Sequence, residues 1–300
     1  MAGPRIRAFH RADLTPAALA DAKGSTRVSV CLPARNEAAT VGPIVSAIRD
    51  ALVDAHPVVD ELLVIDDHST DGTADIAAAA GAHVVDAPSV LPEYGEGHGK
   101  GEALWKSLFV ADGDVIVWCD ADIRDFDVAF VTGVLGPLLT RDDVDFVKGF
   151  YERRDRAGTG RGGRVTELVA RPAIAVFFPE LADVVQPLSG EYGGRREVLE
   201  RLPFVQGYGV DLGLLVDVTR LVGVDRIAQV DLGERVHRNR DLDELSPQAL
   251  AVLLTALRRA DGDLVGTSAT LRRPGLDDLT VSVIERPPLR DVPAYHRHSA

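Results

Sequence analysis

Short continuous apolar runs alternate with amphipathic stretches along the first half of the chain. Such runs are typical of strands that are buried on both faces, and apolar positions three and four residues apart indicate one face of a helix. Strands separated by helices form right-handed βαβ units and a parallel sheet. We therefore predict a doubly wound α/β fold with a mostly parallel sheet flanked by helices. The predicted strands are residues 27–33, 61–66, 83–86 and 115–119, and the predicted helices between them are residues 37–55, 74–80 and 100–111.

The second half of the chain has a weaker pattern. It predicts helices at residues 128–139, 165–180, 209–222 and 247–259, and extended segments at 145–148, 226–230 and 279–284. A charge- and glycine-rich loop is expected at 149–163. Because residues 1–25 are polar and weakly patterned, we expect a loose leader there. The predicted division is that leader, a first part at 26–148, a second part at 149–262 and a C-terminal tail at 263–300.

Composition narrows the class of protein. A hydrophobic content of 46% in 300 residues is enough for a sizeable core. The formal net charge of −13 argues against nucleic acid or an anionic membrane as the main partner. No apolar run approaches the roughly 18 residues of a membrane span. Cys31 and Cys119 lie in strand-like apolar runs, which is typical of reduced core thiols. A soluble cytoplasmic protein is therefore expected.

Asp120 and Asp122 follow directly after the predicted strand at 115–119. Two carboxylates at positions i and i+2 of a strand end point the same way. They offer hard oxygen ligands for Mg²⁺ or Mn²⁺, and such an ion can hold a diphosphate. Two ordinary acids in a solvated turn would give the same local pattern. The residues at the other strand ends are therefore needed to distinguish a metal site from such a turn.

Polar groups also mark the other strand ends at this edge of the sheet. The turn Pro33-Ala34-Arg35-Asn36-Glu37 follows the first strand, Asp67 follows the second, and Lys100 opens the helix before the fourth. Open α/β sheets bind ligands at this edge. Asp67 could accept a hydrogen bond from a pyrimidine N3–H, and Lys100 could neutralise a phosphate. A solvated polar rim is the alternative.

Two basic segments stand out in this acidic chain. Between residues 148 and 164 there are six basic and two acidic residues, and Arg235, Arg238 and Arg240 surround His237. An imidazole next to carboxylates suits Mn²⁺ as well as Mg²⁺. A lone histidine is also a common surface or core residue. The chain has neither a GxGxxG motif after the first strand nor a GxxxxGK[ST] motif, which argues against dinucleotide and P-loop sites.

Several motifs resemble known families. Leu32-Pro-Ala-Arg-Asn-Glu37, Val64-Ile-Asp-Asp-His-Ser-Thr-Asp-Gly-Thr73 and Cys119-Asp-Ala-Asp122 resemble GT-A glycosyltransferases. Five further motifs resemble the glucosyl-3-phosphoglycerate synthases of actinobacteria, with a weaker echo at 285–289. These motifs lie at Gly99–Trp105, Gly162–Pro172, Gln186–Tyr192, Gly207–Val210 and Ala228–Arg240.

The resemblance implies a retaining, metal-dependent transfer of glucose from a nucleotide sugar, usually UDP-glucose, to the 2-hydroxyl of 3-phosphoglycerate. It implies a front-face route in which the leaving phosphate oxygen takes the acceptor's proton, and it implies a homodimer. The implied catalytic groups are Lys100, the main-chain carbonyl of Leu188 and Asp211. The implied donor-binding residues are Pro33, Ala34, Asn36, Glu37, Asp67, Lys100, Asp120 and Tyr208. The implied metal ligands are Asp122 and His237, and the implied acceptor-binding residues are Gly163, Arg164, Thr166, Arg235 and Asn239.

Two positions depart from the family pattern. Asp211 stands where a glutamate is expected, which shortens its reach toward the donor sugar by one methylene. The Asp66-Asp67 pair is closer to the wider superfamily than to this family, so nucleotide contacts could differ.

Three other functions compete with this one. They are a mannosyl-3-phosphoglycerate synthase that uses GDP-mannose, a transferase that acts on a polyprenyl phosphate, and a catalytically silent sensor of nucleotide sugars. The acidic charge and the lack of apolar spans count against the polyprenyl phosphate. The full set Asp120, Asp122 and His237 counts against the sensor.

Overall fold

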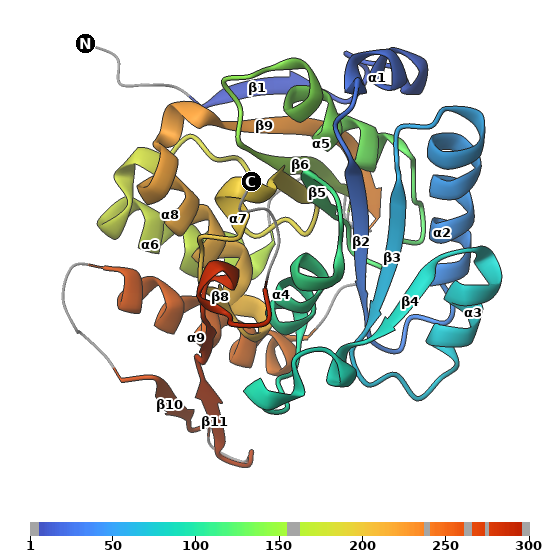
Figure 1. Ribbon diagram of the computed structural model, residues 1–300. Helices are drawn as coiled ribbons and strands as arrows, with labels where there is room; N and C mark the ends of the chain where they lie inside the picture. The colour runs from blue at the N-terminus through green and yellow to red at the C-terminus, as the bar shows by residue number, and fades with distance from the viewer. Residues whose placement is uncertain (1–5, 155–162, 237–240, 261–265, 274–275, 296–300) are drawn as a thin grey trace, which may run out of the picture.

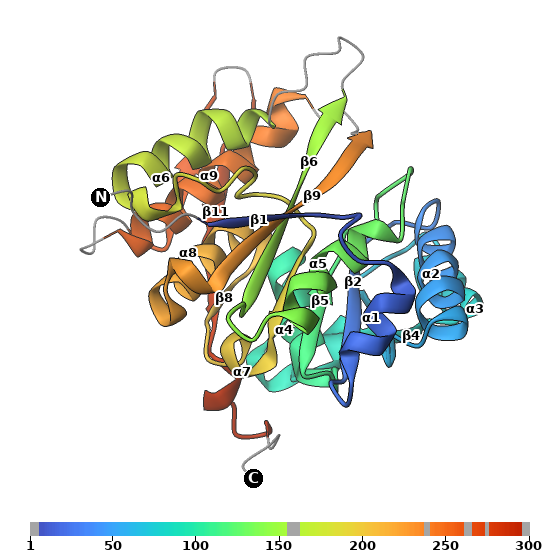
Figure 2. The same cartoon turned by 90° about the horizontal axis from the view of Figure 1, so that it is seen from above.

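A mostly parallel eight-stranded sheet flanked by helices forms the centre of the molecule (Figures 1 and 2). The computed structural model describes residues 6–154, 163–236, 241–260, 266–273 and 276–295. In the described chain the strands of the sheet follow the order β1-β9-β6-β7-β5-β2-β3-β4. Their bounds are β1 Arg7–His10, β2 Val28–Ala34, β3 Glu61–Asp66, β4 His83–Asp86, β5 Val115–Trp118, β6 Phe146–Arg154, β7 Tyr192–Arg195 and β9 Ile227–Val236. The predicted α/β class is confirmed.

Helices connect and cover these strands. They are α1 Pro16–Lys23, α2 Val41–Arg49, α3 Thr73–Ala80, α4 Lys100–Val110, α5 Ala129–Thr140, α6 Arg171–Phe177, α7 Arg196–Leu199, α8 Val210–Val222 and α9 Leu242–Arg259. Two small antiparallel pairs lie outside the main sheet: β8 Phe204–Val205 with β12 Glu285–Arg286, and β10 Ser268–Leu271 with β11 Leu279–Ser282. No helix in the described residues is long and apolar enough to cross a membrane.

The central strand β5 shows why the apolar runs are continuous. Val115 and Val117 pack into the hydrophobic cluster on one face of the sheet, and Ile116 and Trp118 pack into the cluster on the other. Because successive side chains point to opposite faces, a strand covered on both sides has no polar positions. Cys119 extends this run, and both cysteines are buried free thiols.

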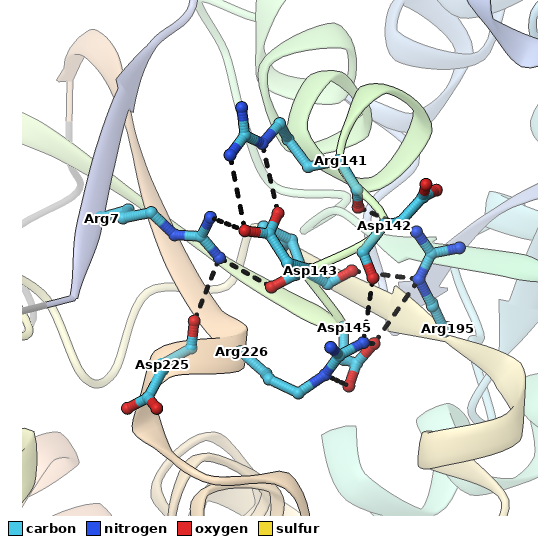
Figure 3. A network of polar contacts seen from close by, with 9 residues as sticks. Arg7, Arg141, Asp142, Asp143, Asp145, Arg195, Asp225 and Arg226 are labelled. Atoms are coloured by element: carbon cyan, nitrogen blue, oxygen red, sulfur yellow. Dashed lines mark hydrogen bonds and ion pairs between the residues drawn. The ribbon is translucent and has the colours of Figure 1, made fainter. Parts of the chain in front are cut away.

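The prediction of a loose leader was wrong for residues 7–23. β1 pairs in parallel with β9 at the sheet edge, and Leu19 of α1 is fully buried. The polar pattern misled because an edge strand shields only one face. Arg7 anchors β1 by donating to the Asp143 carboxylate at 2.6 Å and to the main-chain oxygen of Asp225 at 3.0 Å (Figure 3).

Figure 3 shows that this anchor belongs to a wider polar network of arginines and aspartates. Arg226 pairs with Asp145, which opens β6, and Arg195 of β7 lies 3.6 Å from the same carboxylate. The arginines thus tie the starts of β1, β6 and β9 to the end of β7.

The predicted loop at 149–163 was wrong for its first part, because β6 continues to Arg154 beside a longer β9. The two strands pair in parallel with an irregularity between Phe150 and Glu152. Glu152 and Glu234 face solvent there, so the main-chain ladder continues although the apolar pattern has ended. The residues 155–162 lie outside the described part.

The sequence did not indicate β7, which runs antiparallel between β5 and β6. Its sequence, Tyr192-Gly-Gly-Arg195, has two residues of low strand propensity. The packing requires them, because a Cβ at Gly193 would lie 2.5 Å from the Ile116 main-chain oxygen. This strand carries Tyr192 and, just before it, Glu191 into the site.

Candidate active site

Lys100 joins two acidic side chains at the carboxyl edge of the sheet. Its Nζ lies 3.0 Å from Oδ1 of Asp120 and 3.1 Å from Oδ1 of Asp211. Asp120 follows β5, Lys100 is the first residue of α4, and Asp211 lies in the first turn of α8. Three of the residues predicted from separate motifs therefore meet in one place.

Arg235 reaches the same edge from β9 and is buried among carboxylates. It donates to Glu191 Oε1 at 2.6 Å and to Asp122 Oδ1 at 2.7 Å, and it lies 3.4 Å from Asp120 Oδ2. The sequence predicted Arg235 at the acceptor, and that role stays a prediction. Its pairing with Asp120 and Asp122 was not predicted, although the implied ligation of one metal ion by Asp122 and His237 already placed this segment close to the end of β5.

The turn Asp120–Asp122, called the acidic turn below, has space only because residue 190 is a glycine. A Cβ there would lie 1.9 Å from Asp120 Oδ2, so any side chain would displace that carboxylate. The turn is also held by Thr40, whose hydroxyl donates to the main-chain oxygen of Ala121 at 2.7 Å. Both contacts fix the direction in which Asp120 and Asp122 point.

The charges of this cluster depend on one another. Burial favours the neutral form of Asp120, but Lys100 and Arg235 outweigh it and hold the pKa of Asp120 well below its usual range. Burial also opposes the charge of Lys100, yet Asp120 and Asp211 raise the pKa of Lys100 well above its usual value. For Glu191, the effect of burial exceeds the opposite effect of Arg235 and raises the pKa of this carboxyl to about 7.

Lys148 and Tyr192 form a layer next to this cluster. Lys148 Nζ lies 3.9 Å from the centroid of the Tyr192 ring, and Lys100 Nζ lies 5.4 Å from it. Among the described residues neither Lys148 Nζ nor the Tyr192 hydroxyl has a hydrogen-bond partner, and both side chains are buried. Burial lowers the pKa of Lys148 to about 8, opposed by Asp211. The sequence analysis missed this pair; a lysine ending an apolar extended run was the available signal.

The turn after β2 is locked to the turn after β3. Asn36 has a left-handed backbone with φ 58°, and its Oδ1 accepts a hydrogen bond from Thr70 N at 2.8 Å. Glu37 N donates to Thr73 Oγ1 at 2.8 Å. Pro33 and Ala34 end β2 and pair with Ile65 and Asp66 of β3. These predicted donor-binding residues therefore lie at the same edge as Asp67.

The turn after β3 also contacts the start of α4. Asp67 is buried, and its Oδ2 accepts from Gly99 N at 2.7 Å. Gly99 lies so close to Gly207 that its Cβ would be 3.0 Å from the Gly207 Cα. Tyr208, which is exposed in the turn before α8, is therefore brought next to Lys100.

The predicted acceptor-binding residues are placed only in part. Gly163 and Arg164 precede the π-helical turn Thr166–Ala170, with Arg164 exposed and Thr166 buried. Leu188 is partly buried, two residues before Gly190. His237 and Asn239 lie outside the described residues, so their predicted roles remain predictions.

The acidic turn fits a divalent cation. Asp122 is a carboxylate at the sheet edge with 46% of its side chain exposed, and it stands beside the fixed carboxylate of Asp120. Oxygen donors of this kind are what Mg²⁺ and Mn²⁺ prefer. Asp122 would be the ligand, and Asp120 would be its neighbour held by Lys100 and Arg235.

Comparison with known proteins extends this picture. The sequence profile of glycosyl transferase family 2 matches residues 29–191. The glucosyl-3-phosphoglycerate synthase of Mycolicibacterium smegmatis is 48% identical over 290 residues, which cover 94% of this chain and 95% of that protein. The similarity therefore spans both the sheet edge and the second half of the chain.

Two solved structures are similar over nearly the whole chain. One is the glucosyl-3-phosphoglycerate synthase of Mycobacterium tuberculosis in complex with Mn²⁺, UDP-glucose and phosphoglyceric acid, with a TM-score of 0.86 and 45% identity, covering 95% of this chain and 98% of that one. The other is the mannosyl-3-phosphoglycerate synthase of Rubrobacter xylanophilus, with a TM-score of 0.86 and 39% identity, covering 95% and 97%.

Proposed function

Because this chain belongs to the glucosyl-3-phosphoglycerate synthases of glycosyl transferase family 2, we propose that it transfers glucose from UDP-glucose to the 2-hydroxyl of 3-phosphoglycerate. The reaction depends on a divalent metal ion, as the Mn²⁺ in the similar M. tuberculosis structure indicates. The products are glucosyl-3-phosphoglycerate and UDP. The chain is thus a hexosyltransferase with the GT-A fold.

One observation supports this function most strongly: a lysine, two neighbouring carboxylates and a third carboxylate from another helix converge at the nucleotide-binding edge of the sheet. Lys100 contacts Asp120 and Asp211 within 3.1 Å, and Asp122 stands beside Asp120 with its side chain half exposed. A metal ion held by Asp122 and His237 would neutralise charge on the departing diphosphate. Such electrostatic stabilisation is usually the largest contribution to catalysis.

Lys100 acts on the same developing charge from the protein side. Its ammonium is held between Asp120 and Asp211. When the donor binds, a phosphate oxygen can become the third partner of this ammonium. Since the acidic neighbours keep Lys100 protonated, it offers a permanent positive charge to the leaving group.

We propose that the transfer retains the anomeric configuration by a front-face route. Asp211 orients the sugar from the N-terminal turn of α8, while the main-chain carbonyl of Leu188 faces the oxocarbenium-like centre. The leaving phosphate oxygen then takes the proton of the acceptor hydroxyl. No protein nucleophile is needed, and the buried pairing of Asp211 with Lys100 agrees with a positioning role.

The acceptor carries a phosphate and a carboxylate, so it needs cations that an acidic chain must concentrate locally. We propose that Arg164, Thr166, the main chain of Gly163, Arg235 and Asn239 bind it. Arg164 is exposed just before the Thr166–Ala170 turn, so solvent-borne anions can reach its side chain. Arg235 would bind the acceptor with the same guanidinium that donates to Asp122.

One specific observation supports GDP-mannose as an alternative donor. The mannosyl-3-phosphoglycerate synthase of R. xylanophilus superposes as well as the glucosyl enzyme does, with a TM-score of 0.86 for each. Overall shape therefore does not separate the two donors. Identity favours UDP-glucose, at 45% against 39%.

The proposed function is tested by following UDP release and isolating the product. We expect UDP release from UDP-glucose only when a divalent metal ion and 3-phosphoglycerate are both present, and an α-linked product by NMR from the α-linked donor. UDP release without acceptor would identify a hydrolase, and a β-linked product would contradict the retaining route. No turnover with any nucleotide sugar would leave only the silent sensor.

We also propose that the enzyme is a cytoplasmic homodimer. Two buried free thiols fit a reducing compartment. For the dimer, the support is a pair of strongly exposed apolar side chains, Leu168 and Val176, on the run formed by the Thr166–Ala170 turn and α6.

A further inference from the structure

Two histidines and an aspartate gather beside the nucleotide-binding edge, outside the acidic turn of the catalytic site. Asp67, His68 and His98 each offer one ligand atom, and these atoms lie within 4.8 Å of one another. The two imidazole rings have their centroids 4.5 Å apart. We propose that this group is a transition-metal site, distinct from the Asp122 site, and that a metal ion bound there competes with the donor's base.

The site is built from two turns that are already joined. Asp67 and His68 follow β3, whereas His98 precedes α4. Asp67 Oδ2 accepts a hydrogen bond from Gly99 N at 2.7 Å, which places the main chain next to His98 against the first turn. Little reorganisation is therefore needed to bring the three ligands around one ion.

Asp67 also orients one of the histidines. Its Oδ1 lies 2.8 Å from Nδ1 of His68. Since Oδ1 and Nδ1 lie this close together, both atoms can bind one ion, which would replace the proton that they share. His68 itself has a left-handed backbone with φ 62°, which turns its side chain back over Asp67.

The donor set determines which ions bind. Two imidazoles and one carboxylate suit Zn²⁺, Cu²⁺ or Ni²⁺ better than Mg²⁺, which prefers an all-oxygen shell. His98 is exposed and His68 half-buried, so an ion can enter from solvent while Asp67 closes the inner side. The three protein ligands leave one tetrahedral position open.

Occupation of this site has a consequence for the reaction, and this part rests on the proposed function. Asp67 is the residue expected to accept the N3–H of the uracil base. A metal ion on its carboxylate removes that acceptor and adds positive charge where the N–H must approach. Zn²⁺ and the donor nucleotide should therefore exclude one another.

The site itself is tested without substrate, by equilibrium dialysis against Zn²⁺ in the presence of excess Mg²⁺. We expect the wild-type enzyme to bind a Zn²⁺ ion that His98→Gln and His68→Asn bind at least about tenfold more weakly. Asparagine is chosen at 68 because it tolerates the left-handed backbone. His83→Gln, which alters an exposed histidine of β4, is the matched control and should bind as the wild type does.

The competition is tested separately, by measuring how UDP-glucose shifts Zn²⁺ binding to the wild-type enzyme. We expect UDP-glucose to raise the Zn²⁺ concentration needed, with no such shift for His98→Gln. Zn²⁺ affinity that is equal in all four proteins would overturn the site. Zn²⁺ binding that depends on both histidines but ignores UDP-glucose would overturn only the competition, and an inactive enzyme that still binds Zn²⁺ would count against the proposed function alone.

Discussion

Lys148 shows at the scale of one residue how burial sets chemistry near the site. Its ammonium packs on the Tyr192 ring at 3.9 Å and has no hydrogen-bond acceptor among the described residues. Burial lowers the pKa of Lys148 from 10.5 to about 8. Keeping this lysine charged at neutral pH therefore costs folding free energy.

We predict that Lys148→Met removes a pH-dependent component of stability. Between about pH 8 and pH 10.5 the unfolded chain binds the proton that the folded chain has lost, so the stability of the wild type relative to the variant rises with pH in this window. The slope cannot exceed about 1.4 kcal/mol per pH unit for one proton. Urea denaturation at several pH values measures the difference. A difference independent of pH from 8 to 10.5 would contradict this account.

A substitution at Asp122 should impair metal binding without destabilising the fold. Asp122→Asn keeps the shape of a half-exposed side chain, so we expect little change in stability. Loss of its charge should lower metal-dependent kcat on the order of 10²-fold or more. Mn²⁺ titration of the rate measures this, with Asp125→Asn, an exposed acid on the same turn, as control. Equal effects of the two substitutions would show that Asp122 is not a ligand.

Residues at strand ends could be predicted from the sequence, and residues brought in by the interior of the fold could not. Asp67 and Asp120 stand where apolar runs stop and Lys100 opens a predicted helix, so parallel topology alone gathers them at one edge. Glu191 and Tyr192 depend on an antiparallel strand inserted between β5 and β6, which local patterning does not reveal.

At the scale of elements, a buried ion pair fastens the C-terminal segment to α4. Arg286 of β12 makes two contacts with Glu102, at 2.6 and 2.9 Å, and Lys106 lies 3.2 Å from the same carboxylate. The Trp105 indole N–H donates to the main-chain oxygen of Pro287 at 2.9 Å. The C-terminal residues 285–292 thus help to hold the helix that begins with Lys100, and are not a loose tail.

We predict that Arg286→Met costs about 3–5 kcal/mol of stability, because it removes two contacts to the buried Glu102 carboxylate and leaves it with Lys106 and Gln206. The double variant Arg286→Met with Glu102→Gln should lose less than the sum of the two single losses, since it removes both members of the buried pair together, although the buried Lys106 ammonium then lacks its carboxylate. Chemical denaturation of the wild type, both single variants and the double variant gives the coupling. Additive losses would show that the pair does not act as a unit.

The elements of the first half show where apolar patterns predict structure and where they do not. Apolar runs located strands β2, β3 and β5 because these strands are covered on both faces. Apolar periodicity located the helices of the first half because one face of each is buried. β1 and α1 lie at the edge of the sheet, where half of each element faces solvent and the pattern weakens. The arginine contacts that hold β1 join residues more than a hundred positions apart.

At the scale of the whole molecule, the exposed apolar pair on α6 and the preceding turn predicts an interface. Leu168 is 72% exposed and Val176 69%. Figure 2 shows that α6, which contains Val176, lies beside α9. We expect Leu168→Glu with Val176→Glu to shift a homodimer to monomer in light scattering coupled to size exclusion. Leu279→Glu, on the exposed face of β11, is the control. A dimer that persists in the double variant would place the interface elsewhere.

The central claim is glucose transfer from UDP-glucose to 3-phosphoglycerate, and a donor panel tests it most directly. The enzyme would be given 3-phosphoglycerate and a divalent metal ion with UDP-glucose, GDP-glucose, GDP-mannose or UDP-galactose, and the product would be identified by mass spectrometry and NMR. We predict the highest kcat/KM with UDP-glucose and glucosyl-3-phosphoglycerate as the product. A higher kcat/KM with GDP-mannose, yielding mannosyl-3-phosphoglycerate, would contradict the account.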